Sequence, residues 1–207
     1  MIREFYIRDT AKVAKELLGK MLVHNTAEGV VKGMIVETEA YYGELDPASH
    51  AYGGKKTPRN EAMWGPPGYA YVYFTYGMHY MLNVVTGKDG EARAVLIRAV
   101  EPLEGIELMK KRRNKRVKSL ELRVKGSKDG LRNLTNGPAR LTQAFGIDKH
   151  QNKVDMINSN LRILGQEETP DPTRRFKIVS CPRIGIKQGT IEKLRFYIDG
   201  NSFVSKV

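Results

Sequence analysis

The pattern of apolar and polar positions near the start of the chain predicts one short helix. Apolar residues recur at helical spacing from Val13 to Leu18, with Asp9 before this segment and Gly19 after it. An aspartate can accept hydrogen bonds from the first free amides of a helix, and a glycine can take the left-handed conformation after the last turn. We therefore predict an amphipathic helix that packs on a core.

Short β-prone segments account for much of the remaining chain. The segments 69–74 and 79–86 flank Tyr76 and Gly77. Because glycine can supply turn geometry, we predict a β-hairpin with Tyr76 near its tip. Segments typical of strands also occur at 21–24, 29–37, 92–100, 161–164, 176–180 and 194–198.

Two further helices are predicted in the second half of the chain. One begins at Ile106 and extends to about Arg113, and the other follows Asn136 and ends at Gly146. In the second, the asparagine can cap the helix, the proline that follows fits the first turn, and the N-terminus could hold a phosphate. The segment 119–134 between them is polar and predicts an irregular surface segment.

No internal repeat, low-complexity tail or linker-like stretch divides the sequence, and 207 residues are enough for one buried core. The predicted elements therefore indicate a single domain, residues 1–207, with mixed helices and strands and a largely antiparallel sheet.

The charge balance points to an anionic partner. Lys and Arg number 35 against 23 Asp and Glu, which gives a net charge of +12. Such an excess is typical of proteins that bind the phosphate backbone of nucleic acids, although a basic protein can also simply be soluble or bind an anionic membrane. We interpret the basic run from Lys110 to Lys118 as a solvated helix end and the mobile loop after it, which attract phosphates non-specifically, in preference to a dedicated contact patch.

Other features bear on the cellular compartment. No apolar run approaches the roughly 18 residues of a transmembrane helix, and the N-terminus lacks the apolar region of a secretory signal. The single cysteine, Cys181, excludes an internal disulfide and a CxxC metal pair. We therefore expect a cytoplasmic protein that does not bind membranes, associated with the nucleoid if it is prokaryotic.

The stretch that begins at Glu37 gathers the most chemically suggestive side chains. Glu37 and Glu39 end a predicted strand and share one of its faces, so either could act as a general base, although both could also be ordinary exposed acids. A long loop that carries His50 follows, and after it a run of tyrosines. Long loops in compact domains are usually functional or disordered, and the turn residues here favour function. The combination suggests a nucleobase pocket.

Several other residues have both a chemical and a structural interpretation. Arg98 lies in an apolar strand, so it must be paired if it is buried, with Glu39 or a DNA phosphate as partner, or else it faces solvent. Tyr76 suits a wedge that enters the DNA minor groove, or an exposed turn residue. At least half of the tyrosines in the hairpin are expected to serve packing alone. The four histidines are scattered, so we expect no catalytic metal.

Five blocks in order resemble the alkyladenine, or 3-methyladenine, DNA glycosylase family of the mixed α/β type. They are VETEAY (36–41), DPASHAYGGKKTPRN (46–60), YVYFTYGMHYMLNVV (71–85), AVLIRAVEPLEG (94–105) and NGPARL (136–141). The resemblance implies an α+β fold, with a curved, largely antiparallel sheet, surrounding helices and a protruding hairpin.

The resemblance also implies an activity. Such an enzyme flips an alkylated or deaminated purine out of double-stranded DNA and hydrolyses its N-glycosidic bond without a cofactor, leaving an abasic site. The expected lesions are of the 3-methyladenine, 7-methylguanine, hypoxanthine and ethenoadenine type, and we expect a monomer. The residues that match the family's functional positions are Glu39 as the base that activates water, Arg98 as a residue that places this water, Tyr41, His50 and Tyr73 around the flipped base, Asn83 against the 2-amino group of normal guanine, and Tyr76 as the side chain that enters the duplex.

Three other classes of function fit the sequence less well. A non-catalytic basic module could use the tyrosines as stacking platforms for nucleic acid, but it would leave a Glu39–Arg98 pairing without a purpose. A metal-dependent nuclease needs clustered ligands that the sequence does not offer. A glycosylase with lyase activity needs an amine nucleophile, and no lysine matches a motif, so we expect water as the nucleophile.

Overall fold

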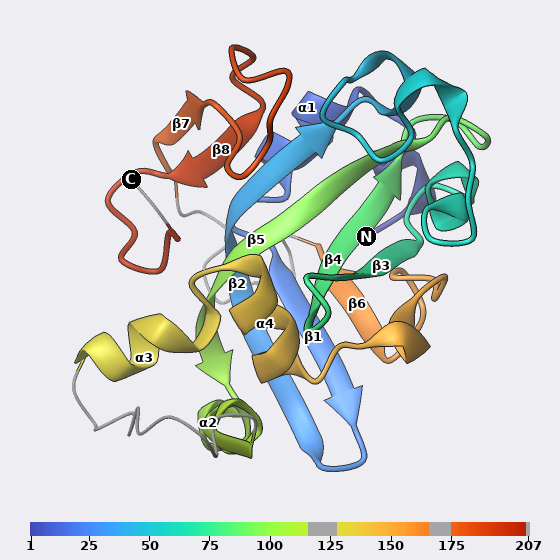
Figure 1. Ribbon diagram of the computed structural model, residues 1–207. Coiled ribbons are helices and arrows are strands. Elements are labelled where there is room, and N and C mark those ends of the chain that lie inside the picture. The colour runs from blue at the N-terminus through green and yellow to red at the C-terminus, as the bar shows by residue number, and fades with distance from the viewer. Residues whose placement is uncertain (116–127, 166–174, 206–207) are drawn as a thin grey trace.

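The computed structural model describes residues 1–115, 128–165 and 175–205, and this part of the chain is built on one antiparallel sheet (Figure 1). The strands run in the order β3-β4-β5-β2-β1-β6, with β8 pairing the second half of β2 and β7 pairing β8. The bounds are β1 Met21–Thr26, β2 Gly29–Tyr41, β3 Ala70–Thr75, β4 His79–Thr86, β5 Arg93–Glu104, β6 Leu161–Leu164, β7 Ile178–Cys181 and β8 Arg195–Ile198. With its helices, this sheet confirms the predicted α+β class.

β2 is the central strand and runs further than the sequence indicates. β5 pairs with it along one side, while β1 pairs with its first half and β8 with its second half. The predicted end at residue 37 is wrong, because the backbone from Thr38 to Tyr41 continues to pair with β5. Glu37 and Glu39 therefore lie inside the sheet, where neighbouring strands fix the direction of their side chains.

The helices lie on the sheet and at its edges. α4 packs on β4 and β5, in front of the strands in Figure 1, while α2 and α3 pack against α4, and α1 packs on β2 and β5. The bounds are α1 Thr10–Glu16, α2 Ile106–Lys115, α3 Lys128–Thr135 and α4 Pro138–Phe145, with short 3-10 helices η1 Arg3–Phe5, η2 Gly43–Leu45, η3 Tyr52–Gly54, η4 Glu61–Trp64 and η5 Lys149–Gln151. Asp9 caps α1 as predicted, since its carboxylate accepts a hydrogen bond from the Lys12 amide.

Two predictions about the second half of the chain are wrong. Residues 128–134 of the expected irregular segment belong to α3, in which Leu131 and Leu134, three positions apart, face the core. α4 is not capped by Asn136, because its N-cap is Gly137 and the asparagine oxygen accepts a hydrogen bond from Arg140 instead. Residues 119–127 of the same segment lie outside the described residues.

The core forms two apolar clusters. The larger one joins the helices to the sheet, and the smaller one lies under the loop between β2 and β3, where Ala51, Met63 and Tyr71 are buried together. Burying a side chain such as that of Met63 stabilises the fold by about 1.5–3 kcal/mol. The smaller cluster thus anchors the long loop and fixes its position relative to the sheet.

The basic run from Lys110 to Lys118 is less solvated than expected. Arg112 donates hydrogen bonds to Thr26 and to Glu28, and its side chain is only 10% exposed. It therefore ties α2 to the β1–β2 turn. Residues 116–118 of the run lie outside the described residues.

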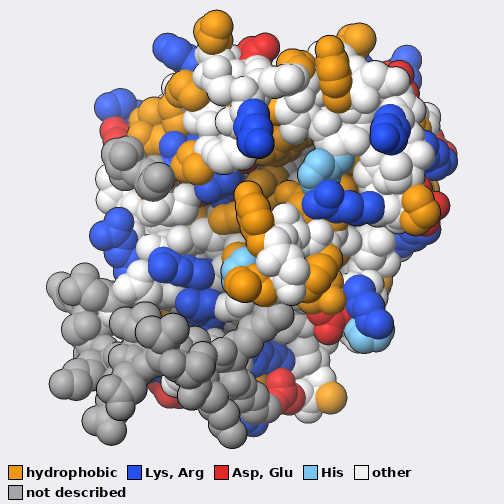
Figure 2. Space-filling view, viewed as in Figure 1, with side chains coloured by type: hydrophobic (Ala, Val, Ile, Leu, Met, Phe, Trp, Pro, Cys, Tyr) orange, Lys and Arg blue, Asp and Glu red, His pale blue; other side chains and the backbone are white. Residues whose placement is uncertain are grey.

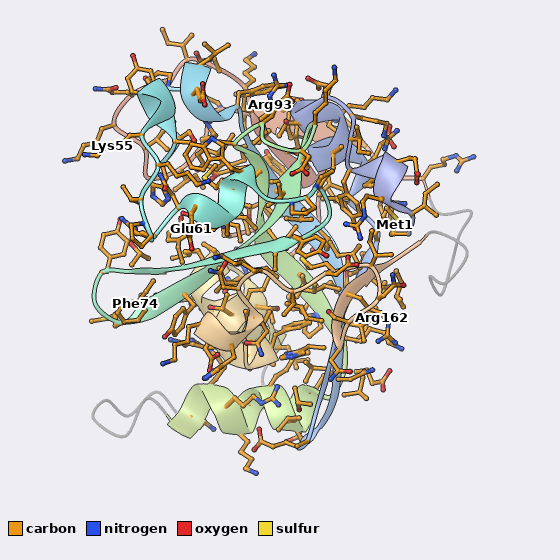
Figure 3. All side chains as sticks on the ribbon, turned by 90° about the vertical axis from the view of Figure 1, so that its right-hand side faces the viewer. Met1, Lys55, Glu61, Phe74, Arg93 and Arg162 are labelled. Carbon is orange, nitrogen blue, oxygen red and sulfur yellow. The ribbon has the colours of Figure 1, made fainter. Side chains whose placement is uncertain are left out.

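The β3–β4 hairpin ends in the tight turn that the sequence predicts. The Met78 amide donates to the Thr75 carbonyl, and the two central residues, Tyr76 and Gly77, have φ values of 52° and 66°. Such a turn requires positive φ at both central positions, which is strained for a tyrosine. Tyr76 is 79% exposed at the tip. Figure 3 shows the hairpin, labelled at Phe74, projecting to the same side as the loop that carries Lys55.

Among the described residues, no helix is long and apolar enough to cross a membrane.

Candidate active site

A cleft of about 620 Å³ opens between the long loop, the hairpin and the segment after β7. The loop lines one wall with residues 47–50, the hairpin lines another with Tyr71, Tyr73 and Asn83, and residues 184–188 complete it. On the face shown in Figure 2, Lys and Arg side chains clearly outnumber Asp and Glu. The cleft is large enough for a nucleobase and lies on a basic surface.

Glu39 lies directly beneath the cleft. It is fully buried, and its partners, Tyr41, Arg98 and Ile184, all line the cleft. Oε1 accepts a hydrogen bond from the Ile184 amide at 2.8 Å and lies 3.2 Å from an Arg98 nitrogen, while Oε2 accepts one from the Tyr41 hydroxyl at 2.8 Å. A carboxylate has about four acceptor positions, so Oε2 keeps capacity for one more donor.

Glu37 is equally buried but has a different environment. Its oxygens accept hydrogen bonds from Arg98 Nε at 2.8 Å, from Arg195 Nε at 2.7 Å, and from the amide and hydroxyl of Ser205. Burial alone would raise the pKa of the Glu37 carboxyl, but Arg98, the Ser205 amide and Arg195 outweigh it and hold the pKa below its usual range. Glu37 is thus an ionised anchor for two guanidinium groups, and it does not line the cleft.

Arg98 joins the two acids and borders the cleft. Its side chain is only 8% exposed, so the prediction that it must be paired is confirmed, with Glu37 as a second partner beside Glu39. Burial disfavours its charge, yet Glu39 and Glu37 outweigh this effect and raise the pKa of the guanidinium. A permanent cation therefore holds both carboxylates and presents its remaining surface to the cleft.

The predicted base-binding residues meet on the walls. The rings of His50 and Tyr73 are in edge contact with centroids 4.5 Å apart, and His50 Nδ1 lies 2.8 Å from the Tyr71 hydroxyl oxygen. The surrounding protein, and next the charge of Arg59, lower the pKa of His50 to about 4, so the ring is neutral at pH 7. Tyr41 lies on the cleft at the end of β2. The walls are therefore aromatic and carry no ionised histidine.

Asn83 and Tyr76 lie at opposite depths of the cleft. The Asn83 amide is 4% exposed and donates to the Tyr71 carbonyl at 3.0 Å, which fixes its orientation. Tyr76 lines the mouth from the hairpin tip. The structure thus brings together all seven site residues that the sequence indicates, with Glu39 behind the lining and the other six on it.

Comparison with known proteins agrees with this arrangement. The profile of the methylpurine-DNA glycosylase family matches residues 4–202. The chain belongs to the methylpurine-DNA glycosylase family. It is 49% identical over 208 residues to a protein of Clostridium acetobutylicum (99% of this chain, 97% of the relative) and 47% identical over 204 residues to one of Carboxydothermus hydrogenoformans (99% and 97%). Both relatives are provisionally named 3-methyladenine DNA glycosylases.

The structure of this methylpurine-DNA glycosylase family member also contains a clamp that the sequence did not reveal. Arg183 is bound by both carboxylate oxygens of Asp46, donates to the Ala40 carbonyl at 3.0 Å, and lies 4.8 Å from the centroid of the Tyr41 ring. The next amide, that of Ile184, is the one that binds Glu39. The clamp therefore fixes two walls of the cleft and one contact of the buried acid.

The sequence also did not reveal that Arg195 and Ser205, near the C-terminal end of the chain, bind Glu37. The local signals for these contacts are limited to an arginine that follows Pro182 and another at the start of an apolar strand. Among the residues that the structure describes, no group of three or more His, Cys, Asp or Glu side chains is arranged to hold a metal ion.

Proposed function

We propose that this chain removes alkylated or deaminated purines from double-stranded DNA by hydrolysis with a water molecule activated by Glu39. Membership of the methylpurine-DNA glycosylase family makes it a DNA repair enzyme, a hydrolase of the N-glycosidic bond. The finer proposal concerns the lesions, of the 3-methyladenine, 7-methylguanine, hypoxanthine and ethenoadenine type, and the residues that act on them.

The observation that carries the proposal is the position of Glu39 under an aromatic cleft. Arg98 and the Ile184 amide bind one carboxylate oxygen, which keeps the group oriented, while the other oxygen has acceptor capacity beyond the Tyr41 hydroxyl. A general base must lie within hydrogen-bond reach of the water that it activates, and contacts in the free enzyme tighten when the substrate binds. Glu37 is instead held by Arg98, Arg195 and Ser205, and of these three only Arg98 is among the described residues that line the cleft.

The proposed reaction is a displacement at the sugar. The water oxygen forms a bond to C1′, Glu39 accepts a proton from this water, and the base departs with the electron pair of the broken C–N bond. Positive charge develops on the sugar in the transition state, and the ionised carboxylate also offsets this charge. Arg98 orients Glu39 and helps to place the water.

We assign binding of the flipped purine to the cleft walls. Tyr41, His50 and Tyr73 enclose it, and the buried amide of Asn83 obstructs the 2-amino group of a normal guanine. Tyrosine faces attract cationic bases by about 0.5–2 kcal/mol each. Alkylation at N3 or N7 also makes a purine a good leaving group, so the walls favour bases that depart readily.

The outer surface is suited to the duplex. Tyr76 at the hairpin tip fills the space that the flipped base vacates, an exchange of stacking for contact with bent DNA. Pro138 brings the N-terminus of α4 to the edge of the cleft, where helix amides favour a phosphate. A single chain supplies all of these groups, so we propose that the enzyme acts as a monomer.

The test is release of free base from duplexes that carry one hypoxanthine or one 7-methylguanine, with an undamaged duplex as the control. We expect the wild-type protein to release the damaged bases, to leave an abasic site on an intact strand, and to form no borohydride-trapped adduct. Activity should survive prolonged EDTA treatment. Tight binding to all three duplexes without release would contradict the proposal and favour a non-catalytic stacking module.

A further inference from the structure

Two guanidinium groups cover the tyrosine walls of the cleft. Arg59 Cζ lies 5.3 Å from the centroid of the Tyr73 ring, and Arg183 Cζ lies 4.8 Å from that of the Tyr41 ring. Both tyrosines line the cleft, whereas neither arginine is among the described residues that line it. Each ring therefore lines the cleft and has a guanidinium group within cation–π distance that is not part of the lining.

The two cations differ in how far their charge is offset. Arg183 is buried and bound by both oxygens of Asp46. Arg59 is exposed, and within the described part of the chain no carboxylate forms an ion pair with it. Its charge nevertheless acts within the cleft. Burial is the larger cause of the lowered pKa of His50, and the charge of Arg59 lowers this pKa further. Arg59 is thus the cation whose charge acts on the aromatic walls without a local counterion.

A cation outside Tyr73 has opposite effects on the two classes of damaged purine. The face of a tyrosine attracts cations, but a positive group already beside the ring weakens that attraction and repels a second cation. A purine alkylated at N7 carries a positive charge that falls toward zero as the bond breaks. A neutral purine such as hypoxanthine instead gains negative charge, because the electron pair of the bond remains with it. Arg59 therefore disfavours binding of the first class and stabilises the transition state of the second.

We propose that Arg59 is a specificity-determining residue that acts through the Tyr73 ring and shifts the enzyme toward neutral damaged purines relative to cationic ones. This inference rests on the proposed function of the cleft. The charge of Arg59 also supplies an electrostatic aid for neutral leaving groups that does not require transfer of a proton.

The experiment measures single-turnover release of hypoxanthine and of 7-methylguanine under subsaturating enzyme, and takes the ratio of the two second-order rate constants. The variants are Arg59→Gln, which removes the charge, and Arg59→Lys, which keeps it. Lys55→Gln is the matched control, because Lys55 is an exposed cation of the same loop and no described aromatic ring lies under it. Any loss of non-specific DNA affinity lowers both rate constants and cancels in the ratio.

We expect Arg59→Gln to lower the hypoxanthine to 7-methylguanine ratio about two- to fivefold, and Arg59→Lys and Lys55→Gln to leave it near the wild-type value. An unchanged ratio in Arg59→Gln, with both bases still released, would overturn this inference alone. An equal shift in Arg59→Lys would also overturn it, because the charge would then not be the cause. Release of neither base by the wild-type protein would overturn the proposed function together with this inference.

Discussion

Glu37 and Glu39 bind the same guanidinium from one face of β2. Glu37 lies 2.8 Å from Arg98 Nε, and Glu39 lies 3.2 Å from another nitrogen of the same group. Only Glu39 has its other partners on the lining of the cleft, whereas Glu37 turns toward Arg195 and Ser205. The shared arginine divides the pair into a structural acid and the acid to which we assign catalysis.

This division predicts different losses of stability. Glu37→Gln removes the charge that offsets Arg98 and Arg195 in a buried site, and we expect it to lower the free energy of unfolding by about 3–5 kcal/mol. Glu39→Gln leaves Arg98 paired with Glu37, and we expect a loss of about 1–3 kcal/mol. Urea unfolding of the two variants measures the difference, and an equal or larger loss in Glu39→Gln would contradict the assignment.

The environment of Glu37 also predicts how stability depends on pH. Its pKa is lowered in the folded protein from the ordinary value of 4.5, so the unfolded chain binds more protons near and below this pH. The contribution of Glu37 is therefore fully present above about pH 4.5 and is lost as the pH falls through the folded pKa. Urea midpoints measured from pH 7 to pH 3 should fall less steeply for Glu37→Gln than for the wild type. Parallel curves would contradict the prediction.

Tyr76 is predicted to promote base release from duplex DNA while lowering the stability of the folded protein. Its positive φ of 52° is unfavourable for a tyrosine, and asparagine tolerates this conformation better. We expect Tyr76→Asn to leave stability unchanged or to raise it by up to about 1 kcal/mol. Base release from duplex DNA should fall about tenfold, an effect similar to the loss of one to two kcal/mol of stacking.

Single-stranded DNA provides the control for Tyr76, because it has no base stack to refill. The loss caused by Tyr76→Asn should be much smaller on that substrate. Equal losses on duplex and single-stranded DNA would place the tyrosine in another role.

The clamp between Arg183 and Asp46 is predicted to stabilise the walls of the cleft. Arg183→Met leaves the Asp46 carboxylate buried without its bidentate partner, and we expect a loss of about 3–5 kcal/mol. The double variant Arg183→Met/Asp46→Asn removes both charges and should be more stable than Arg183→Met alone. A double-mutant cycle by thermal or urea unfolding checks this, and strict additivity of the two losses would show that the pair is not coupled.

Local signals in the sequence predicted the elements that depend on near neighbours. Asp9 caps α1, Gly77 forms the hairpin turn, and Arg98 within an apolar strand has the paired, buried setting that its surroundings require. α3 was missed although Leu131 and Leu134 have helical spacing, because the polar residues around them dominate the segment.

The parts of the site that could not be predicted depend on partners far away in the sequence. Arg183 binds Asp46 across 137 positions, and Arg195 and Ser205 bind Glu37 across 158 and 168 positions. Neither periodicity nor turn chemistry carries information over such separations, so the burial of Glu37 and its structural role emerge only from the folded chain.

The central claim is that Glu39 activates the water that attacks C1′. Its most direct test is the single-turnover rate of hypoxanthine release by Glu39→Gln beside wild type, with the enzyme in saturating excess and duplex binding measured in parallel. General base catalysis contributes about 10²–10⁴-fold, so we predict a rate loss of that size with DNA affinity close to that of the wild type. A Glu39→Gln variant that binds the duplex and releases hypoxanthine at nearly the wild-type rate would contradict the account.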